Sequence, residues 1–266
     1  MKKVFGIPSW LPDKEPARSQ RQERINRLFK QLNDLWPDID ILVIAQNWQD
    51  FKPIETRNKQ IVKQYDPLGI LKARQVLRAE FLKLDYDYII MFDDDAIIKF
   101  TDKTCVKNYM QILDKHPTGF CFVPGSGSDG YAQAQLNLCA ISRYIYEKEP
   151  IPNIDPQNNE GYEDQIYAHL LHIKYARFEF KFPDGLKCIQ FQNKSEAAPS
   201  TWAGEVHSKG WRMLQAGTKK VSQYINDYKD MPRDEELKKI FTEVREKFTR
   251  PKIENKGYVG MGWFNF

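Results

Sequence analysis

The chain has 266 residues, of which 41% are hydrophobic, 13% aromatic and 29% charged. This composition supports one sizeable apolar core, either as one domain or as one domain with an appendage, and no stretch approaches the ~20 consecutive apolar residues of a membrane-spanning helix. The net charge of +4 favours polyanionic partners such as a nucleotide, a nucleic acid or an anionic membrane surface, without choosing among them. The sequence therefore indicates a globular protein.

The cysteines and the N-terminus bear on the compartment. The four cysteines are widely spaced and contain no C-x-x-C pair, so neither a zinc site nor a disulfide framework is indicated. Reduced thiols are the ordinary state in the cytoplasm. The N-terminus lacks the apolar core of ~7–15 residues that a signal peptide needs. We expect a cytoplasmic protein, with peripheral contact to the inner face of the membrane left open.

Strand and helix patterns alternate along the first half of the chain. A short apolar strand is expected at 3–7, a helix at 19–35 and a buried strand at 40–45. A second helix at 70–84 and a third strand at 87–92 follow. This alternation predicts an α/β fold with a mostly parallel, crossover-linked sheet flanked by helices.

The second half is less regular. Further elements are expected as helices at 102–115 and near 163, and as strands at 119–123, 137–142, 175–182 and 187–192. The glycine-rich loop 125–130 lacks the strand-to-helix context and the lysine of a phosphate-binding loop. We therefore do not interpret it as a phosphate-binding loop.

Three consecutive carboxylates, Asp93, Asp94 and Asp95, end the third strand. Ligands of open α/β sheets bind outside the carboxyl ends of the strands, where a few carboxylates can hold a hard divalent cation. In an extended segment Asp93 and Asp95 would face the same side and Asp94 the other. The alternative is a solvated acidic turn.

Four features occur in a fixed order around this acidic run. The segment 67–74, with its Gly and Ala-Arg, precedes the strand; the acidic run follows it; the pair Glu163-Asp164 and the segment 204–207 come later. Together they resemble the GT-A fold glycosyltransferases that use nucleotide sugars, in particular the inverting, bacterial, family-2-like type. The resemblance covers roughly residues 3–207.

The resemblance implies a Rossmann-like GT-A fold that transfers a sugar from a nucleotide diphosphate sugar, a UDP-sugar, to a hydroxyl of a saccharide, glycolipid or glycoprotein. It also implies a divalent cation, Mn²⁺ or Mg²⁺, which stabilises the leaving diphosphate as a Lewis acid. The implied metal ligands are Asp93, Asp95 and His207, with Asp93 alternatively on the ribose or the metal's water shell. Imidazole favours Mn²⁺, although a lone histidine is more often structural or exposed.

The acidic pair Glu163-Asp164 is the implied catalytic centre. Removing the proton from an acceptor hydroxyl needs a base, and Asp164 is the candidate, with Glu163 holding the acceptor or orienting the base. The configuration at the anomeric carbon would then invert. Helix capping explains the position of these acids about as well, because carboxylates are favoured in a first helical turn.

The implied donor-binding residues lie at strand ends and on the second helix: Pro8, Ser9, Gln46, Asn47, Arg74, Asp93 and Asp94. The second strand departs from the family here, because many members have an acidic pair where this chain has Gln46 and Asn47. Arg74 could reach a phosphate or be an ordinary surface arginine. The arginines at 18, 21, 24 and 27 are interpreted as a solvated helix face, or else as a contact to an anionic acceptor or membrane.

We expect a GT-A domain at 1–208, with a nucleotide-sugar half at 1–100 and an acceptor half at 101–208. A helical, aromatic extension at 209–266 would pack on this domain or dock a partner. One alternative is a sugar-nucleotide nucleotidyltransferase, but the first strand lacks the glycine-rich basic loop that such enzymes carry. Another is a non-catalytic module for carbohydrate or nucleic acid. We consider nucleic acid the less favoured partner, and the oligomeric state is open.

Overall fold

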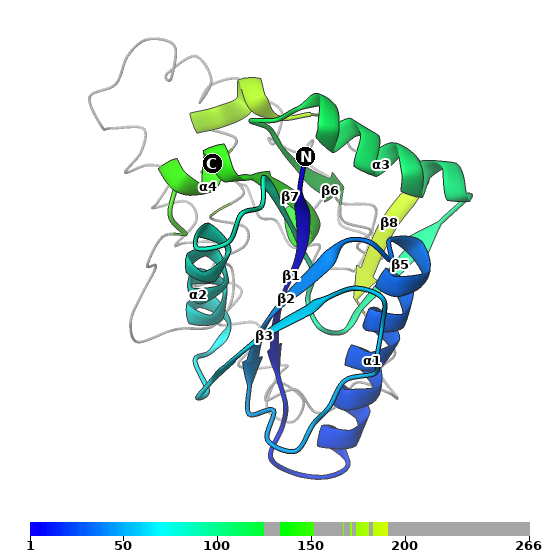
Figure 1. Cartoon of the computed structure of the whole chain (residues 1–266), viewed down its shortest axis with the longest axis vertical. Coiled ribbons are helices and arrows are strands. Elements are labelled where there is room, and N and C mark those ends of the chain that lie inside the picture. The colour runs from blue at the N-terminus through cyan, green and yellow to red at the C-terminus, as the bar shows by residue number, and fades with distance from the viewer. Residues whose placement is uncertain (125–133, 152–166, 168–170, 172–173, 181–182, 191–266) are drawn as a thin grey trace, which may run out of the picture.

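The computed structural model describes residues 1–124, 134–151, 167, 171, 174–180 and 183–190 (Figure 1). The elements in chain order are β1 (Lys3–Trp10), α1 (Ala17–Leu35), β2 (Asp40–Gln46), β3 (Gln60–Tyr65), α2 (Ile70–Leu82), β4 (Tyr88–Met91), β5 (Ala96–Phe100), α3 (Lys103–Lys115), β6 (Phe120–Pro124), β7 (Ala134–Ser142), α4 (Arg143–Lys148), η1 (Ala176–Phe178) and β8 (Leu186–Gln190).

The central sheet has six strands in the order β3-β2-β1-β4-β7-β6. The first four are parallel, whereas β7 runs antiparallel to β4 and β6 antiparallel to β7. A second, antiparallel pair is formed by β5 and β8. The mostly parallel α/β sheet predicted from the alternation of elements is confirmed.

Helices cover both faces of the sheet, as Figure 1 shows for α1 and α2 on opposite sides of the strands. Along β2, Ile41 and Val43 belong to the core that includes α1 and α3, whereas Leu42 and Ile44 belong to the core that includes α2 and α4. Strands buried on both faces must be apolar at every position, which explains their continuous hydrophobic runs.

Local signals set the helix starts. The side chain of Asp102 caps α3 by accepting hydrogen bonds from the backbone N–H groups of Thr104 (2.6 Å) and Cys105 (3.3 Å). Gly69 precedes α2 with a φ of 73°, a left-handed conformation that glycine adopts without strain. Asp102 and Gly69 therefore mark the starts of α3 and α2.

Three elements differ from the sequence-based expectation. The strand predicted at 175–182 is wrong over 175–178, which contains the 3-10 turn η1 and brings the rings of Tyr175 and Phe178 to 6.3 Å of each other. Glu179 forms an isolated β-bridge with Phe120, and 181–182 lie outside the described residues. The strands β3 and β5 were not predicted.

In the described ranges no helix combines the length and the apolar character that crossing a membrane requires. All four cysteines are free and buried.

Candidate functional site

The site lies where the strand order reverses. The chain proceeds from β1 through β2 to β3 on one side, then crosses to β4 on the other side of β1. The carboxyl ends of β1 and β4 are therefore the topological switch point, where open α/β sheets bind ligands. The last ladder bond joins the backbone N–H of Phe92 to the carbonyl of Gly6 at 2.9 Å. Beyond this bond the chain leaves β1.

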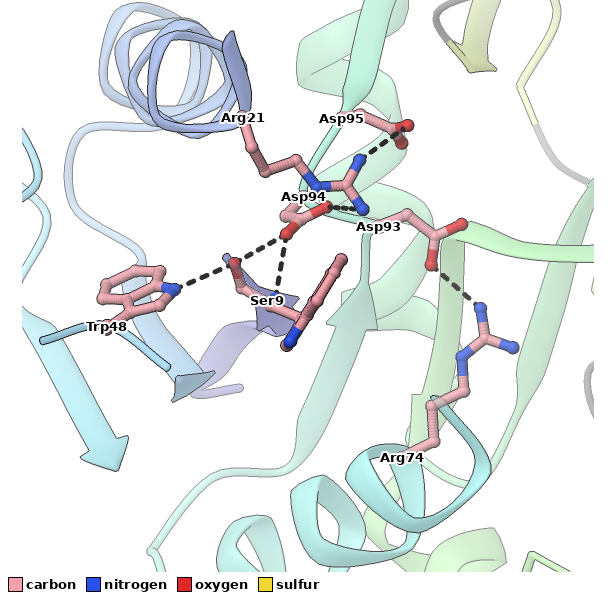
Figure 2. A network of polar contacts seen from close by, with 8 residues as sticks. Ser9, Arg21, Trp48, Arg74, Asp93, Asp94 and Asp95 are labelled. Atoms are coloured by element: carbon pink, nitrogen blue, oxygen red, sulfur yellow. Dashed lines mark hydrogen bonds and ion pairs between the residues drawn. The ribbon is translucent and has the colours of Figure 1, made fainter. Parts of the chain in front are cut away.

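The acidic run forms a turn at this point. The backbone N–H of Ala96 donates to the carbonyl of Asp93 at 3.1 Å, which closes a turn over the three aspartates. The expected side-chain alternation of an extended segment is therefore wrong. Figure 2 shows Asp94 and Asp95 sharing one guanidinium while Asp93 points to another.

Asp94 is held by the end of β1. Its Oδ2 accepts hydrogen bonds from the Ser9 hydroxyl at 2.6 Å and from the backbone N–H of Trp10 at 3.2 Å. The indole Nε1 of Trp48 in turn donates to the Ser9 hydroxyl at 3.2 Å. The side chain of Asp94 is only 4% exposed. Burial raises the pKa of Asp94 to about 6, although Arg21 opposes that shift.

The backbone of β1 is suited to this role. Successive residues of a strand point their N–H groups to opposite neighbours, so Gly6, Pro8 and Trp10 face the β4 side. Gly6 bonds to Phe92, and Trp10 bonds to Asp94. Pro8 has no N–H, and it sits where β4 has already ended, so the proline interrupts no ladder bond of this central strand.

Arg21 bridges two of the three carboxylates. Its Nη2 lies 3.1 Å from Oδ1 of Asp94, and its Nη1 lies 3.2 Å from Oδ2 of Asp95. Burial lowers the pKa of Arg21, but the neighbouring carboxylates outweigh burial, so its pKa is raised. Burial also raises the pKa of Asp95, against the effect of Arg21.

The helix pattern explains why Arg21 faces inward. Arg21 lies four residues before the buried Ile25, and Arg24 lies four residues before the buried Leu28, so both arginines continue the apolar stripe of α1 toward its N-terminus. Arg24 is only 7% exposed. The interpretation of this arginine series as a solvated face is wrong. The continuation of the stripe is the sequence signal that could have identified Arg21.

Arg74, a residue of α2, pairs with the third carboxylate of the turn, that of Asp93. Its Nη2 lies 2.9 Å from Oδ1 of Asp93, and the arginine is 5% exposed. The alternative of a surface arginine is therefore wrong. Trp48, two residues after the end of β2, is a further residue that the sequence analysis missed, and its position after a strand was the only signal.

Gln46 and Asn47 lie at the same edge of the sheet, but their side chains bond to neighbouring loops. The Gln46 side-chain oxygen accepts from the backbone N–H of Leu68 at 2.7 Å, just before α2. The Asn47 amide donates to the carbonyl of Leu11 at 2.8 Å and to Asp13 at 2.6 Å. The structure thus brings Ser9, Gln46, Asn47 and the acidic turn to one edge.

The acidic turn suits a cation in its chemistry. The guanidinium of Arg21 is a cation that Asp94 and Asp95 already bind together through hard carboxylate oxygens. Mg²⁺ and similar ions need only one or two protein carboxylates when substrate phosphates and water complete the shell. Within the described ranges no three His, Cys, Asp or Glu side chains gather as a metal site. The donor set therefore fits a cation shared with a phosphate ligand.

The expected catalytic acids Glu163 and Asp164 and the expected ligand His207 lie outside the described residues, as does the extension at 209–266.

Known proteins provide a fold comparison. No protein-family model and no curated protein matches the sequence. Residues 1–349 of TarS from S. aureus, in complex with UDP-GlcNAc, match with a TM-score of 0.53 and 11% identity over 93% of this chain and 73% of that chain. The same TarS fragment in a second structure gives 0.53 and 13% over 94% and 73%. A197 from STIV gives only 0.40, with 13% identity over 73% and 87%. The chain has the α/β fold of the GT-A glycosyltransferases.

Proposed function

We propose that the protein is a glycosyltransferase that binds a nucleotide diphosphate sugar at the carboxyl ends of β1 and β4. The acidic turn at the topological switch point carries this proposal, because three carboxylates there are held by Ser9, Arg21 and Arg74. The TarS structure of the same fold contains UDP-GlcNAc, which supports a UDP-sugar as the donor.

The described residues would position the donor's charged groups. The donor set of Asp94 and Asp95 would hold a divalent cation, Mn²⁺ or Mg²⁺, which when bound supplies Lewis-acid stabilisation of the leaving diphosphate. Ser9 and the N–H of Trp10 fix Asp94, so its carboxylate cannot rotate freely. Arg74 fixes Asp93, which we propose faces the ribose or the cation's water shell.

The transfer step rests on the sequence resemblance. The acceptor oxygen would attack the anomeric carbon as the bond from that carbon to the diphosphate oxygen breaks, and the hydroxyl proton would pass to Asp164. Glu163 would orient the acceptor or the base, and His207 would complete the cation site. Attack from the face opposite the nucleotide inverts the configuration. The acceptor would be a saccharide, a glycolipid or a glycoprotein.

A donor panel tests the proposal. The protein is incubated with UDP-, GDP- and dTDP-sugars and Mn²⁺, and release of the nucleoside diphosphate is measured. We expect slow hydrolysis of one donor class. Asp95→Asn should reduce it on the order of a hundredfold, as expected when one fixed electrostatic group is lost. The matched control is Asp38→Asn, because Asp38 is exposed and pairs only with the exposed Arg57 among the contacts described.

No release from any donor, or an Asp95→Asn variant as active as Asp38→Asn, would contradict the proposal. Binding of a sugar nucleotide without release would instead indicate a non-catalytic module.

A further inference from the structure

The guanidinium of Arg21 contacts the two carboxylates that the proposed function assigns to a divalent cation. It contacts Asp94 and Asp95 at 3.1 and 3.2 Å, one nitrogen on each carboxylate (Figure 2). These are the two carboxylates that the turn places together. A divalent cation could not use the same oxygens without separating them from Arg21, because two like charges at that distance repel strongly in a partly buried site.

The chain itself supplies cations to each carboxylate of the turn. Three carboxylates, Asp93, Asp94 and Asp95, face Arg74 from α2 and Arg21 from α1, and the buried Arg24 lies one helical turn beyond Arg21. Arg21 and Arg74 thus pair with all three aspartates, and Arg24 adds a longer-range attraction to Asp95. A site of this kind attracts a free divalent cation much less than three unpaired carboxylates would.

The surroundings of Arg21 also allow its side chain to move away from the two carboxylates. Its side chain is 23% exposed, whereas the side chain of Asp94 is 4% exposed, so the solvent reaches the arginine more than the acid. Within the described part of the chain its Nε has no hydrogen-bond partner. Only the two carboxylate contacts of the described residues hold its tip, and Asp94 keeps Ser9 and Trp10 as partners when the arginine moves.

We propose that Arg21 is a built-in competitor of the divalent cation, closing the cation site until a ligand with a diphosphate group brings the cation in. The inference rests on the proposed function for the identity of that ligand. The diphosphate supplies the oxygens that complete the cation's shell, and it offers the displaced guanidinium a new anion, since the arginine fork binds phosphate oxygens well. Cation and nucleotide binding are thereby coupled through one side chain.

The test measures Mn²⁺ alone, without nucleotide. The full chain is titrated with Mn²⁺ at pH 8 and free Mn²⁺ is followed by electron paramagnetic resonance. Arg21→Met removes the charge and keeps most of the apolar stem, so it should bind Mn²⁺ about tenfold more tightly or better, the size expected for losing a charge-assisted contact. Arg21→Lys, which cannot bridge both carboxylates, should fall between that variant and the parent.

Lys30→Met is the matched control. It removes a positive charge from the same helix, but Lys30 is exposed and pairs with Asp34 at 2.7 Å, so its Mn²⁺ affinity should equal that of the parent. Unchanged or weaker Mn²⁺ binding by Arg21→Met would overturn the proposal. If circular dichroism shows that Arg21→Met does not fold, the Mn²⁺ affinity of Arg21→Lys is used instead, and an affinity no higher than that of the parent overturns the proposal.

Failure of this inference and failure of the proposed function are distinguishable. If Arg21→Met binds Mn²⁺ more tightly but the parent releases nucleotide from no donor, Arg21 competes with the cation and the proposed transferase function is wrong. Donor hydrolysis by the parent, with the Mn²⁺ affinity unchanged by Arg21→Met, overturns the competitor and leaves the transferase standing.

Discussion

The two edges of the central sheet carry the same residue types in opposite settings. At the amino edge the ion pairs Lys2 with Asp85 and Arg57 with Asp38 are largely exposed on both partners. At the carboxyl edge Asp94 is almost fully buried and bound by Ser9, Trp10 and Arg21. Exposed pairs contribute little to stability, whereas burying a carboxylate costs solvation free energy that only specific partners offset. The difference supports the carboxyl edge as the place of the proposed donor site.

A cavity of about 520 Å³ lies at the amino edge and could suggest the opposite choice. Its lining includes Lys2, Asp38 and Asp85, which are solvent-exposed. Lys2 pairs with Asp85, and Asp38 pairs with Arg57. Volume alone is a weaker criterion than buried, shifted carboxylates at a switch point, because functional sites are where such shifts gather. These criteria support our proposal that the donor binds at the carboxyl edge.

The largest difference between the edges should come from removing one acid at each. Asp94→Ala leaves Arg21 and Ser9 without their shared carboxylate, and we expect the free energy of unfolding to fall by about 2 kcal/mol. This is less than a fully buried pair would lose, because Arg21 keeps some exposure. Asp85→Ala should cause no measurable change. Urea denaturation of both variants makes the comparison, and equal losses would show that the edges do not differ.

A smaller effect is expected from Ser9→Ala. The hydroxyl donates to Asp94 and accepts from Trp48, so its loss should reduce the free energy of unfolding by about 1.5 kcal/mol. The same substitution in the Asp94→Ala background should lose clearly less, because one of its two partners is already gone. Additive losses in the double variant would separate Ser9 from the acidic turn.

The smallest effect is expected from Arg57→Ala at the amino edge. The pair with Asp38 is exposed on both sides, so the melting temperature and the release of nucleotide should both match those of the parent protein. Differential scanning fluorimetry and the donor assay measure the two quantities. A clear loss of donor hydrolysis would mean that the amino edge takes part in function after all.

The central strands could be predicted from sequence, because strands buried on both faces are apolar at every position. β3 was missed since it lies at the edge of the sheet and alternates between half-buried and exposed residues. β5 was missed because it follows the acidic run almost at once and its last two residues are exposed, so its apolar part, 96–98, is too short to form a pattern. The position of the acidic run at the carboxyl end of the sheet could be predicted because the acidic residues follow a buried strand.

The internal geometry of the site was harder to predict. Aspartate is as common in a turn as at a strand end. The sequence therefore could not show that Asp94, rather than Asp93, shares a guanidinium with Asp95. Arg21 was misread because charged residues on a helix flank are usually solvated, although its spacing from Ile25 matched the buried stripe. The catalytic role of Asp164 and the ligand role of His207 remain predictions.

The side of β1 that faces the acidic turn has a consequence for how the protein meets other chains. Beyond Gly6 this strand has lost its β4 neighbour, and open strand flanks invite pairing with a foreign strand. Pro8 offers no donor there, and the N–H of Trp10 is already bonded to a side chain. An invading strand would find no free backbone N–H at either position, so this flank of β1 is a poor template for aggregation.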